Sequence, residues 1–135
     1  MAQASSSPSA ATVSVHALSC GHFTLPSHHF IAPSSPSARV TVPSLAFLIQ
    51  HPNSNSTTGK KTTLLFDLGL RGDLTAYPAA IQKHIESRRP IEVRPDVVEN
   101  LARGGMRPED VDYIVLSHVS PVFPLEICQN TNFTE

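Results

Sequence analysis

The stretch LARGGMRPEDVDYIVLSH, residues 101–118, combines the end of a helix, a turn and a strand. Gly104 follows an apolar-periodic segment, where glycine commonly stops a helix. The apolar run at residues 113–116 has the length and composition of a buried strand. Ser117 and His118 follow it directly. The stretch therefore predicts a Ser-His pair at a strand end, a place where metal-dependent hydrolases often carry a ligand.

Two helices are expected before this strand. Residues 75–87, TAYPAAIQKHIES, place Tyr77, Ile81 and Ile85 at four-residue steps, which gives one apolar stripe. Residues 94–105, RPDVVENLARGG, carry acidic residues in the first turn, where the positive end of the helix dipole favours them. We expect Gly104 to provide the left-handed stop of this second helix. Its predicted inner face consists of Val97, Val98, Leu101 and Ala102.

Three strands are expected in the first half of the chain. Residues 13–17 alternate apolar and polar side chains, and Gly21 is expected to end or bend this strand. A proline- and serine-rich surface loop is predicted for residues 25–39. The apolar run 45–49 predicts a strand covered on both faces. Residues 62–66 predict its antiparallel return strand, with Asp67 at its exit.

Composition restricts the classes of function. The chain has 135 residues, 40% hydrophobic content and a formal net charge of -1, so it offers no bulk positive charge for a nucleic acid or an anionic membrane. No apolar run has the roughly 18 residues of a membrane-spanning helix. The first residues lack a basic start and an apolar signal core, which predicts a cytoplasmic protein. Cys20 and Cys128 do not have the spacing of a disulfide framework or a structural zinc site.

The charge distribution indicates the domain organisation. Arg39 is the one charged side chain in residues 1–59, and every Asp and Glu lies at or beyond Asp67. Residues 1–11 are rich in Ser, Ala and Pro and predict a disordered tail. Residues 12–119 are expected to form a domain, and residues 120–135, with two prolines at 121 and 124 and no clear period, do not resemble it.

Three segments together resemble the amino-terminal portion of a metallo-β-lactamase-fold hydrolase of the lactonase-like branch. They are TVPSLAFLIQHP (41–52), LLFDLG (64–69) and LARGGMRPEDVDYIVLSH (101–118), and the similarity covers residues 13–118. The resemblance implies an α/β (α+β) fold class, specifically the amino-terminal half of an αββα sandwich. It also implies a site for two zinc ions at the sheet ends and a small-molecule ester or lactone as substrate. Metal-bound hydroxide would attack the carbonyl of that substrate.

The metal motif of this family, His-x-His-x-Asp-His, is matched here at one position. His118 takes the place of the first histidine and is the candidate metal ligand. Ser120, Val122 and Phe123 stand where the other ligands would be. Asp67 and Gly69 resemble the family's strand-Asp-x-Gly element. Zinc takes about four N, O or S ligands, so we expect no zinc to be bound and assign no catalytic residue.

The resulting functional prediction has two branches. The lineage resembles a zinc-dependent hydrolase, whereas this polypeptide is expected to be a truncated, catalytically incompetent fragment. The alternative is a non-enzymatic protein-binding chain or a genuinely diverged short protein. An uncovered apolar sheet would favour self-association. No nucleophile elbow surrounds Ser117, so a serine hydrolase is not supported. The remaining histidines are interpreted as structural: His16, His22, His28, His29, His51 and His84.

A genetic hypothesis accounts for the abrupt end of the resemblance after His118. Many introns begin with six bases that translate in frame as Val-Ser, and Val119-Ser120 is that pair. On this hypothesis, residues 119–135 are intron sequence read in frame, and a spliced message would restore the motif. The sequence of the transcript across the His118 codon tests it.

Overall fold

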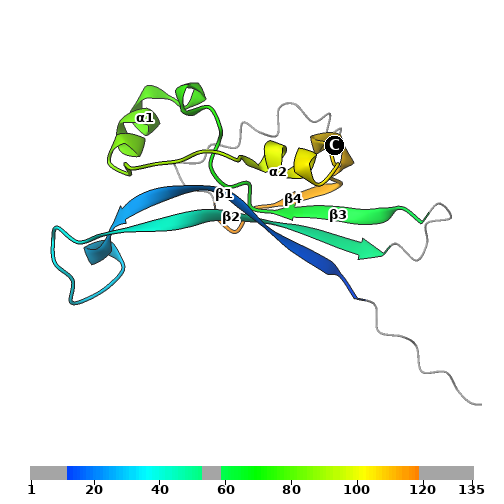
Figure 1. Ribbon diagram of the computed structural model, residues 1–135, viewed down its shortest axis with the longest axis horizontal. Coiled ribbons are helices and arrows are strands. Elements are labelled where there is room, and N and C mark those ends of the chain that lie inside the picture. The colour runs from blue at the N-terminus through cyan, green and yellow to red at the C-terminus, as the bar shows by residue number, and fades with distance from the viewer. Residues whose placement is uncertain (1–11, 53–58, 119–135) are drawn as a thin grey trace, which may run out of the picture.

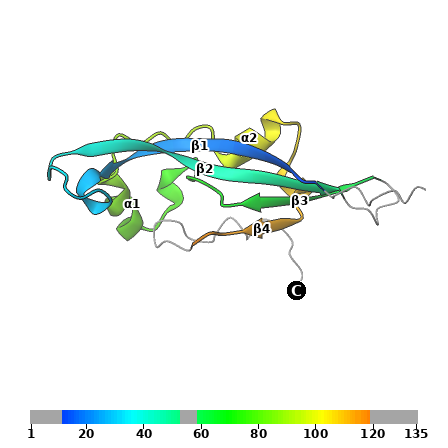
Figure 2. The same cartoon turned by 90° about the horizontal axis from the view of Figure 1, so that it is seen from below.

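The computed structural model describes residues 12–52 and 59–118, and over these ranges the chain is a small α+β protein. One four-stranded mixed sheet has the order β1-β2-β3-β4, as Figures 1 and 2 show. The strands are β1 (Ser14–Pro26), β2 (Arg39–Pro52), β3 (Lys61–Phe66) and β4 (Tyr113–Val115). The helices are α1 (Ala79–Glu86) and α2 (Val97–Arg103). No helix within the described ranges is long and apolar enough to cross a membrane.

The predicted order of three strands, two helices and a strand is confirmed. The predicted antiparallel pairing of β2 with β3 is confirmed as well, whereas β4 joins the far side of β3 in parallel. Short 3₁₀ turns at Ser27–His29, Leu74–Ala76 and Pro108–Asp110 connect these elements. The expected tail at residues 1–11 and the segment after His118 lie outside the described residues.

The hairpin of β1 and β2 is longer than the sequence predicted. Gly21 bends β1 instead of ending it, because the register shifts between Ser19 and His22 and pairing then continues to Pro26. Both ends of the expected loop at residues 25–39 therefore belong to strands. Ser27 N–H closes the base of the shorter loop by donating to the Ala38 carbonyl at 2.8 Å.

Helix α2 begins at Val97, so Asp96 is its N-cap and does not lie within its first turn as predicted. The Asp96 side chain caps it by accepting from the Glu99 N–H at 2.9 Å. Gly104 has a φ of -83°, and its N–H still donates to the Asn100 carbonyl at 3.2 Å. Gly105 has the positive φ, 72°. The prediction that Gly104 provides the left-handed stop is wrong, because Gly104 still belongs to the last helical turn.

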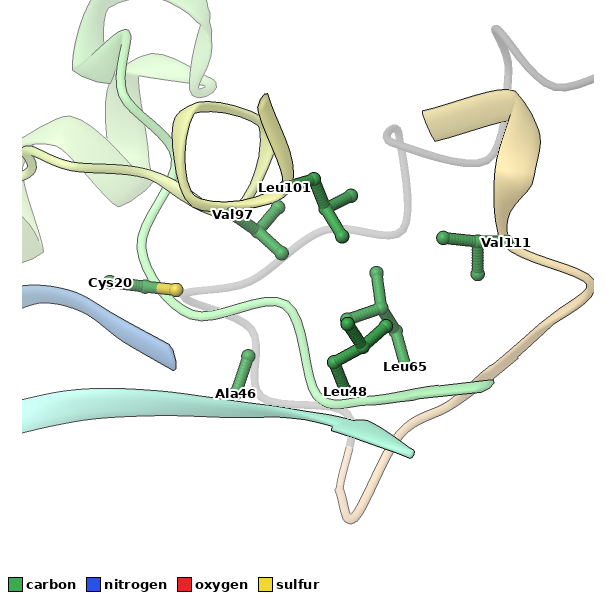
Figure 3. Packing of buried hydrophobic residues seen from close by; sticks show 7 residues of the cluster. All are labelled: Cys20, Ala46, Leu48, Leu65, Val97, Leu101 and Val111. Carbon is green, nitrogen blue, oxygen red and sulfur yellow. The ribbon is translucent and has the colours of Figure 1, made fainter. Parts of the chain in front are cut away.

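One hydrophobic core lies between α2 and one face of the sheet, and Figure 3 shows its side chains. Val97 and Leu101, one helical turn apart, point toward Leu48 and Leu65 of the sheet. Val98 and Ala102 were also predicted to face inward, but both are exposed. The inner stripe is narrower than predicted, because a seven-residue helix lying on a sheet buries one row of side chains. The buried cluster is Cys20, Ala46, Leu48, Leu65, Val97, Leu101 and Val111.

Among residues 12–52 and 59–118, helices cover strand β2 on one face only, so the prediction of cover on both faces is wrong for the described part of the chain. Ala46 and Leu48 point into the core and are buried, whereas Leu45, on the other side of the pleat, is 42% exposed. The two helices both lie above the sheet in Figure 1, and Figure 2 looks at the face that they leave open. The continuous apolar run of β2 therefore places alternate side chains in the core and on the face opposite the helices.

Gly69→Ala tests the contact between the β3 exit and the core. A Cβ at this position would overlap the Cβ of buried Cys20, and Gly69 has a positive φ of 67°. We expect a loss of roughly 2–4 kcal/mol in the free energy of unfolding, measured by urea denaturation. Gly105→Ala is the matched control, because its φ is 72° but no atom lies within 4 Å of the added Cβ. Equal losses in both variants would contradict the predicted clash.

Candidate functional site

The candidate site lies where β3 and β4 end. Because the two strands are parallel, their carboxyl ends meet at one edge of the sheet. Leu64 pairs with Tyr113 and Phe66 with Val115, so the residues that follow each strand come together. The structure thus brings together Asp67 and His118, which the sequence placed at two separate strand ends.

Asp67 forms the corner at the end of β3. Its backbone has a φ of 60°, a left-handed conformation that Asp and Asn tolerate better than most side chains. Its N–H donates to the Val115 carbonyl at 2.8 Å, which continues the hydrogen-bond ladder one step beyond the strand. Its carboxylate then turns toward the chain that leaves β4.

The Asp67 carboxylate holds Ser117 with both oxygens. Oδ1 accepts from the Ser117 N–H at 2.8 Å, and Oδ2 accepts from the Ser117 hydroxyl at 2.7 Å. A carboxylate that accepts one backbone and one side-chain hydrogen bond from the same residue fixes both the position and the rotamer of that residue. Ser117 is therefore fixed to the end of β3 although it follows β4.

Ser117 also contacts the imidazole of His118. The distance between Ser117 Oγ and His118 Nδ1 is 2.9 Å. The hydroxyl has one proton, which it donates to Asp67, so it accepts from Nδ1–H of the ring. In the neutral imidazole this leaves the lone pair on Nε2, the atom that would bind a metal or accept a proton. The chain of contacts from Asp67 through Ser117 orients the candidate ligand.

A pocket of about 250 Å³ opens beside this chain of contacts, and His118 and Asp67 line it. Its buried side includes Tyr77, whose hydroxyl accepts from the Arg71 N–H at 3.3 Å. Burial raises the pKa of the Tyr77 phenol, which keeps it neutral at physiological pH. The pocket is lined by Phe23, Pro43, Ser44, Leu45, Asp67, Leu68, Gly69, Arg71, Tyr77, Leu116 and His118.

Asp112 connects the start of β4 to β3. It thereby holds β4 in place at the end of the strand that lies opposite the candidate site. Its Oδ2 accepts from the Thr63 N–H at 2.8 Å, and its own N–H donates to the Thr63 carbonyl at 2.9 Å. Lys60 contributes an ion pair to Oδ1 at 3.0 Å. The Thr63 N–H and the Lys60 ammonium lower the pKa of the Asp112 carboxyl.

The described residues do not by themselves fit a zinc centre. In residues 12–52 and 59–118, no group of three or more His, Cys, Asp or Glu side chains could hold a metal ion. His118 offers one imidazole, and the Asp67 carboxylate is occupied by Ser117. The other motif positions, Ser120, Val122 and Phe123, lie outside the described residues, and by sequence they supply one hydroxyl and two hydrocarbon side chains.

Several other histidines of the described part make contacts of their own. His22 Nδ1 is 3.8 Å from Glu92 Oε2, and His84 Nε2 is 3.1 Å from an Arg88 guanidinium nitrogen. The rings of His28 and His29 meet edge to face at the tip of the hairpin. None of these residues lines the pocket with His118.

Sequence reasoning missed the structural roles of Ser117 and Asp112. The sequence provided no reason to treat Ser117 as a nucleophile and assigned it no other role, whereas in the structure it connects Asp67 with His118. The sequence did contain a hint of the Asp67–Ser117 contact. An Asp that directly follows one strand and a Ser that follows a parallel neighbouring strand can meet at one edge of the sheet. The missing information was the parallel pairing of β3 with β4.

No family model matches the chain, and the search of the curated proteins returns no significant match.

Asp112→Asn tests the connection between the two strands through its pH dependence. The pKa of Asp112 is lowered in the folded protein, so its contribution to stability is present above the ordinary value of 3.8 and is lost as the pH falls below it. Near pH 7 we expect the variant to be less stable by about 1 kcal/mol, a small value because the ion pair is screened by solvent.

Urea denaturation of both proteins at pH 7 and at about pH 3 measures this difference, which should shrink at the lower pH. Glu109→Gln removes a nearby exposed charge and is the control. A difference between wild type and Asp112→Asn that stays constant across this range would contradict the assignment.

Proposed function

We propose that residues 12–118 form the amino-terminal part of a metallo-β-lactamase-like hydrolase of the lactonase type, with His118 at the position of the first metal ligand. The observation that carries the proposal is the chain of contacts from Asp67 through Ser117 to His118. It orients an imidazole beside a pocket at the shared end of two parallel strands. Sheet ends of this kind are common places for catalytic and binding sites.

The shape of the pocket is consistent with a small ester or lactone. Its lining combines hydrophobic side chains such as Phe23, Leu45 and Leu68 with polar ones that include Asp67 and His118. Ligand pockets commonly combine an apolar lining with a few convergent polar groups. In the family that the chain resembles, zinc-bound hydroxide would supply the nucleophile at such a site.

We further propose that the polypeptide with this sequence is catalytically incompetent. Zinc needs about four ligands, and the motif positions after His118 are Ser120, Val122 and Phe123. Hydrocarbon side chains provide no lone pair, and a neutral hydroxyl is a poor zinc ligand beside imidazole or thiolate. His118 is thus a correctly oriented ligand in an incomplete set.

Zinc content and lactone hydrolysis of the full chain test the proposal directly. We expect substoichiometric zinc after dialysis, measured by atomic emission, and hydrolysis of an acyl lactone no faster than in buffer. The physical reason is that one imidazole leaves the rest of the coordination sphere to water. About one zinc per chain that is lost in His118→Ala would contradict the proposed incompetence.

Restoring the missing ligands tests the position of His118. The triple variant Ser120→His, Val122→Asp, Phe123→His completes the family motif, so we expect zinc affinity to rise by at least about 100-fold. The matched control is the same triple variant with His118→Ala, which should lose most of this gain. Equal zinc affinity with and without His118 would show that the triple variant binds metal independently of the oriented imidazole.

A further inference from the structure

The pocket beside His118 contains two buried hydroxyl groups, those of Ser44 and Tyr77. Ser44 is 8% exposed and Tyr77 5%, so more than nine-tenths of each residue is buried. Buried polar groups nearly always have a hydrogen-bond partner, and one that lacks a partner requires an explanation. The hydrogen bonds that these two hydroxyls make, and those that they leave unmade, therefore indicate what the pocket can bind.

The Ser44 hydroxyl makes no hydrogen bond with residues 12–52 and 59–118. In the same part of the chain, every side-chain nitrogen or oxygen atom that is sealed from solvent does have a partner. The Ser44 oxygen is therefore the part of this buried residue that stays accessible from the pocket. It lies toward Gly69, because a Cβ at Gly69 would be 3.5 Å from Ser44 Oγ.

The sheet is interrupted on both sides of Ser44. Leu45 pairs with Ser19 and Pro43 with His22, so the register of β1 shifts opposite Ser44. On the other side β3 ends at Phe66, opposite Phe47, before it reaches Ser44. Bulges in a strand pair are common next to active sites, where they change the direction of a side chain. Ser44 thus lies on a regular strand at the place where the sheet opens into the pocket.

The Tyr77 hydroxyl accepts one hydrogen bond and keeps its own proton to donate. Its oxygen accepts from the Arg71 N–H at 3.3 Å, and no residue in the described part of the chain accepts from it. Burial raises the pKa of the phenol, so the proton is present at neutral pH. Gln82 fixes the residue, because its Nε2 donates to the Tyr77 carbonyl at 2.6 Å and to the Thr75 carbonyl at 3.0 Å.

Both hydroxyls lie against the segment that follows β3. Ser44 Oγ is directed at Gly69 and the Tyr77 oxygen at Arg71, and two residues of chain span at most about 7 Å. The Asp67 carboxylate at the start of this segment already accepts from Ser117. A carbonyl oxygen accepts hydrogen bonds and donates none, so it is the group that complements two unused hydroxyl donors.

We infer that Ser44 and Tyr77 determine the specificity of this pocket by donating hydrogen bonds to the carbonyl oxygen of a small lactone or ester. The inference rests on the proposed function, which names this class of ligand, and it assigns the groups that would recognise the ligand. A site that hydrogen-bonds a ligand oxygen rejects the analogue without that oxygen, because the buried donors are then left unpaired. The two side chains should therefore separate a lactone from a cyclic ether.

Binding of γ-nonalactone and of the cyclic ether with the same carbon skeleton tests the inference, because the two ligands differ in the carbonyl oxygen. NMR titrations of the backbone amides of the full chain, in buffer without zinc, give both Kd values. We expect the wild type to bind the lactone at least about tenfold more tightly than the ether. Ser44→Ala and Tyr77→Phe should each reduce this ratio at least about threefold, and the double variant should bring it near one.

Tyr113→Phe is the matched control, because Tyr113 is the other tyrosine of the chain, is 58% exposed and does not line the pocket. It should leave both Kd values unchanged. A purely structural effect of Tyr77→Phe would weaken both ligands equally and keep the ratio, which would contradict the inference. A ratio near one in the wild type would overturn it, as would a lactone Kd above about 10 mM. These two results need no variant to fold.

The test is independent of the test of the proposed function. Stoichiometric zinc would contradict the proposed incompetence, but the ratio of the two Kd values is measured without zinc and would not change. A ratio near one would overturn the roles of Ser44 and Tyr77, and the zinc affinity of the triple variant would still decide the position of His118.

Discussion

The corner at Asp67 is the constraint on which the candidate site depends. Its positive φ turns the chain out of β3 while its N–H extends the pairing with β4 by one further hydrogen bond. Its carboxylate then binds Ser117 through both oxygens, and Ser117 orients His118. Without this corner the two strand exits would still be neighbours, but the imidazole would have no fixed direction. A single aspartate thus converts a parallel strand pair into an oriented site.

Alternate side chains along each strand point to opposite faces of the sheet, and the two faces have different surroundings. One face, with α2, encloses the cluster around Leu48, Leu65 and Leu101 and stabilises the described part of the chain. The other face presents apolar side chains that the register aligns, such as Ile49 beside Leu64. The two properties are linked, because the same strands β2 and β3 supply both the core and the opposite face of the sheet.

The sequence predicted the type and order of the elements well, because each depends on local patterns. The helix at Val97–Arg103, with Val97 and Leu101 on its inner face, follows from the apolar periodicity of residues 94–105, whereas the capping role of Asp96 was not predicted. The errors concern tertiary context. A run such as residues 45–49 cannot reveal whether one or both faces are covered, and the composition of residues 25–39 did not reveal that both ends of the predicted loop belong to strands. For the site, His118 and Asp67 were identifiable as strand-end residues, but the role of Ser117 requires knowing that β3 and β4 are parallel neighbours.

A double-mutant cycle between Asp67 and Ser117 tests whether the Asp67 carboxylate holds the Ser117 hydroxyl. Asp67→Gly removes the carboxylate and accepts the positive φ without strain, and Ser117→Ala removes the hydroxyl. Urea denaturation of the wild type, both single variants and the double variant gives the coupling free energy. We expect a coupling free energy of about 1–2 kcal/mol, and one near zero for the control pair Asp73→Gly with Ser117→Ala. Additivity of Asp67→Gly and Ser117→Ala within about 0.3 kcal/mol would contradict it.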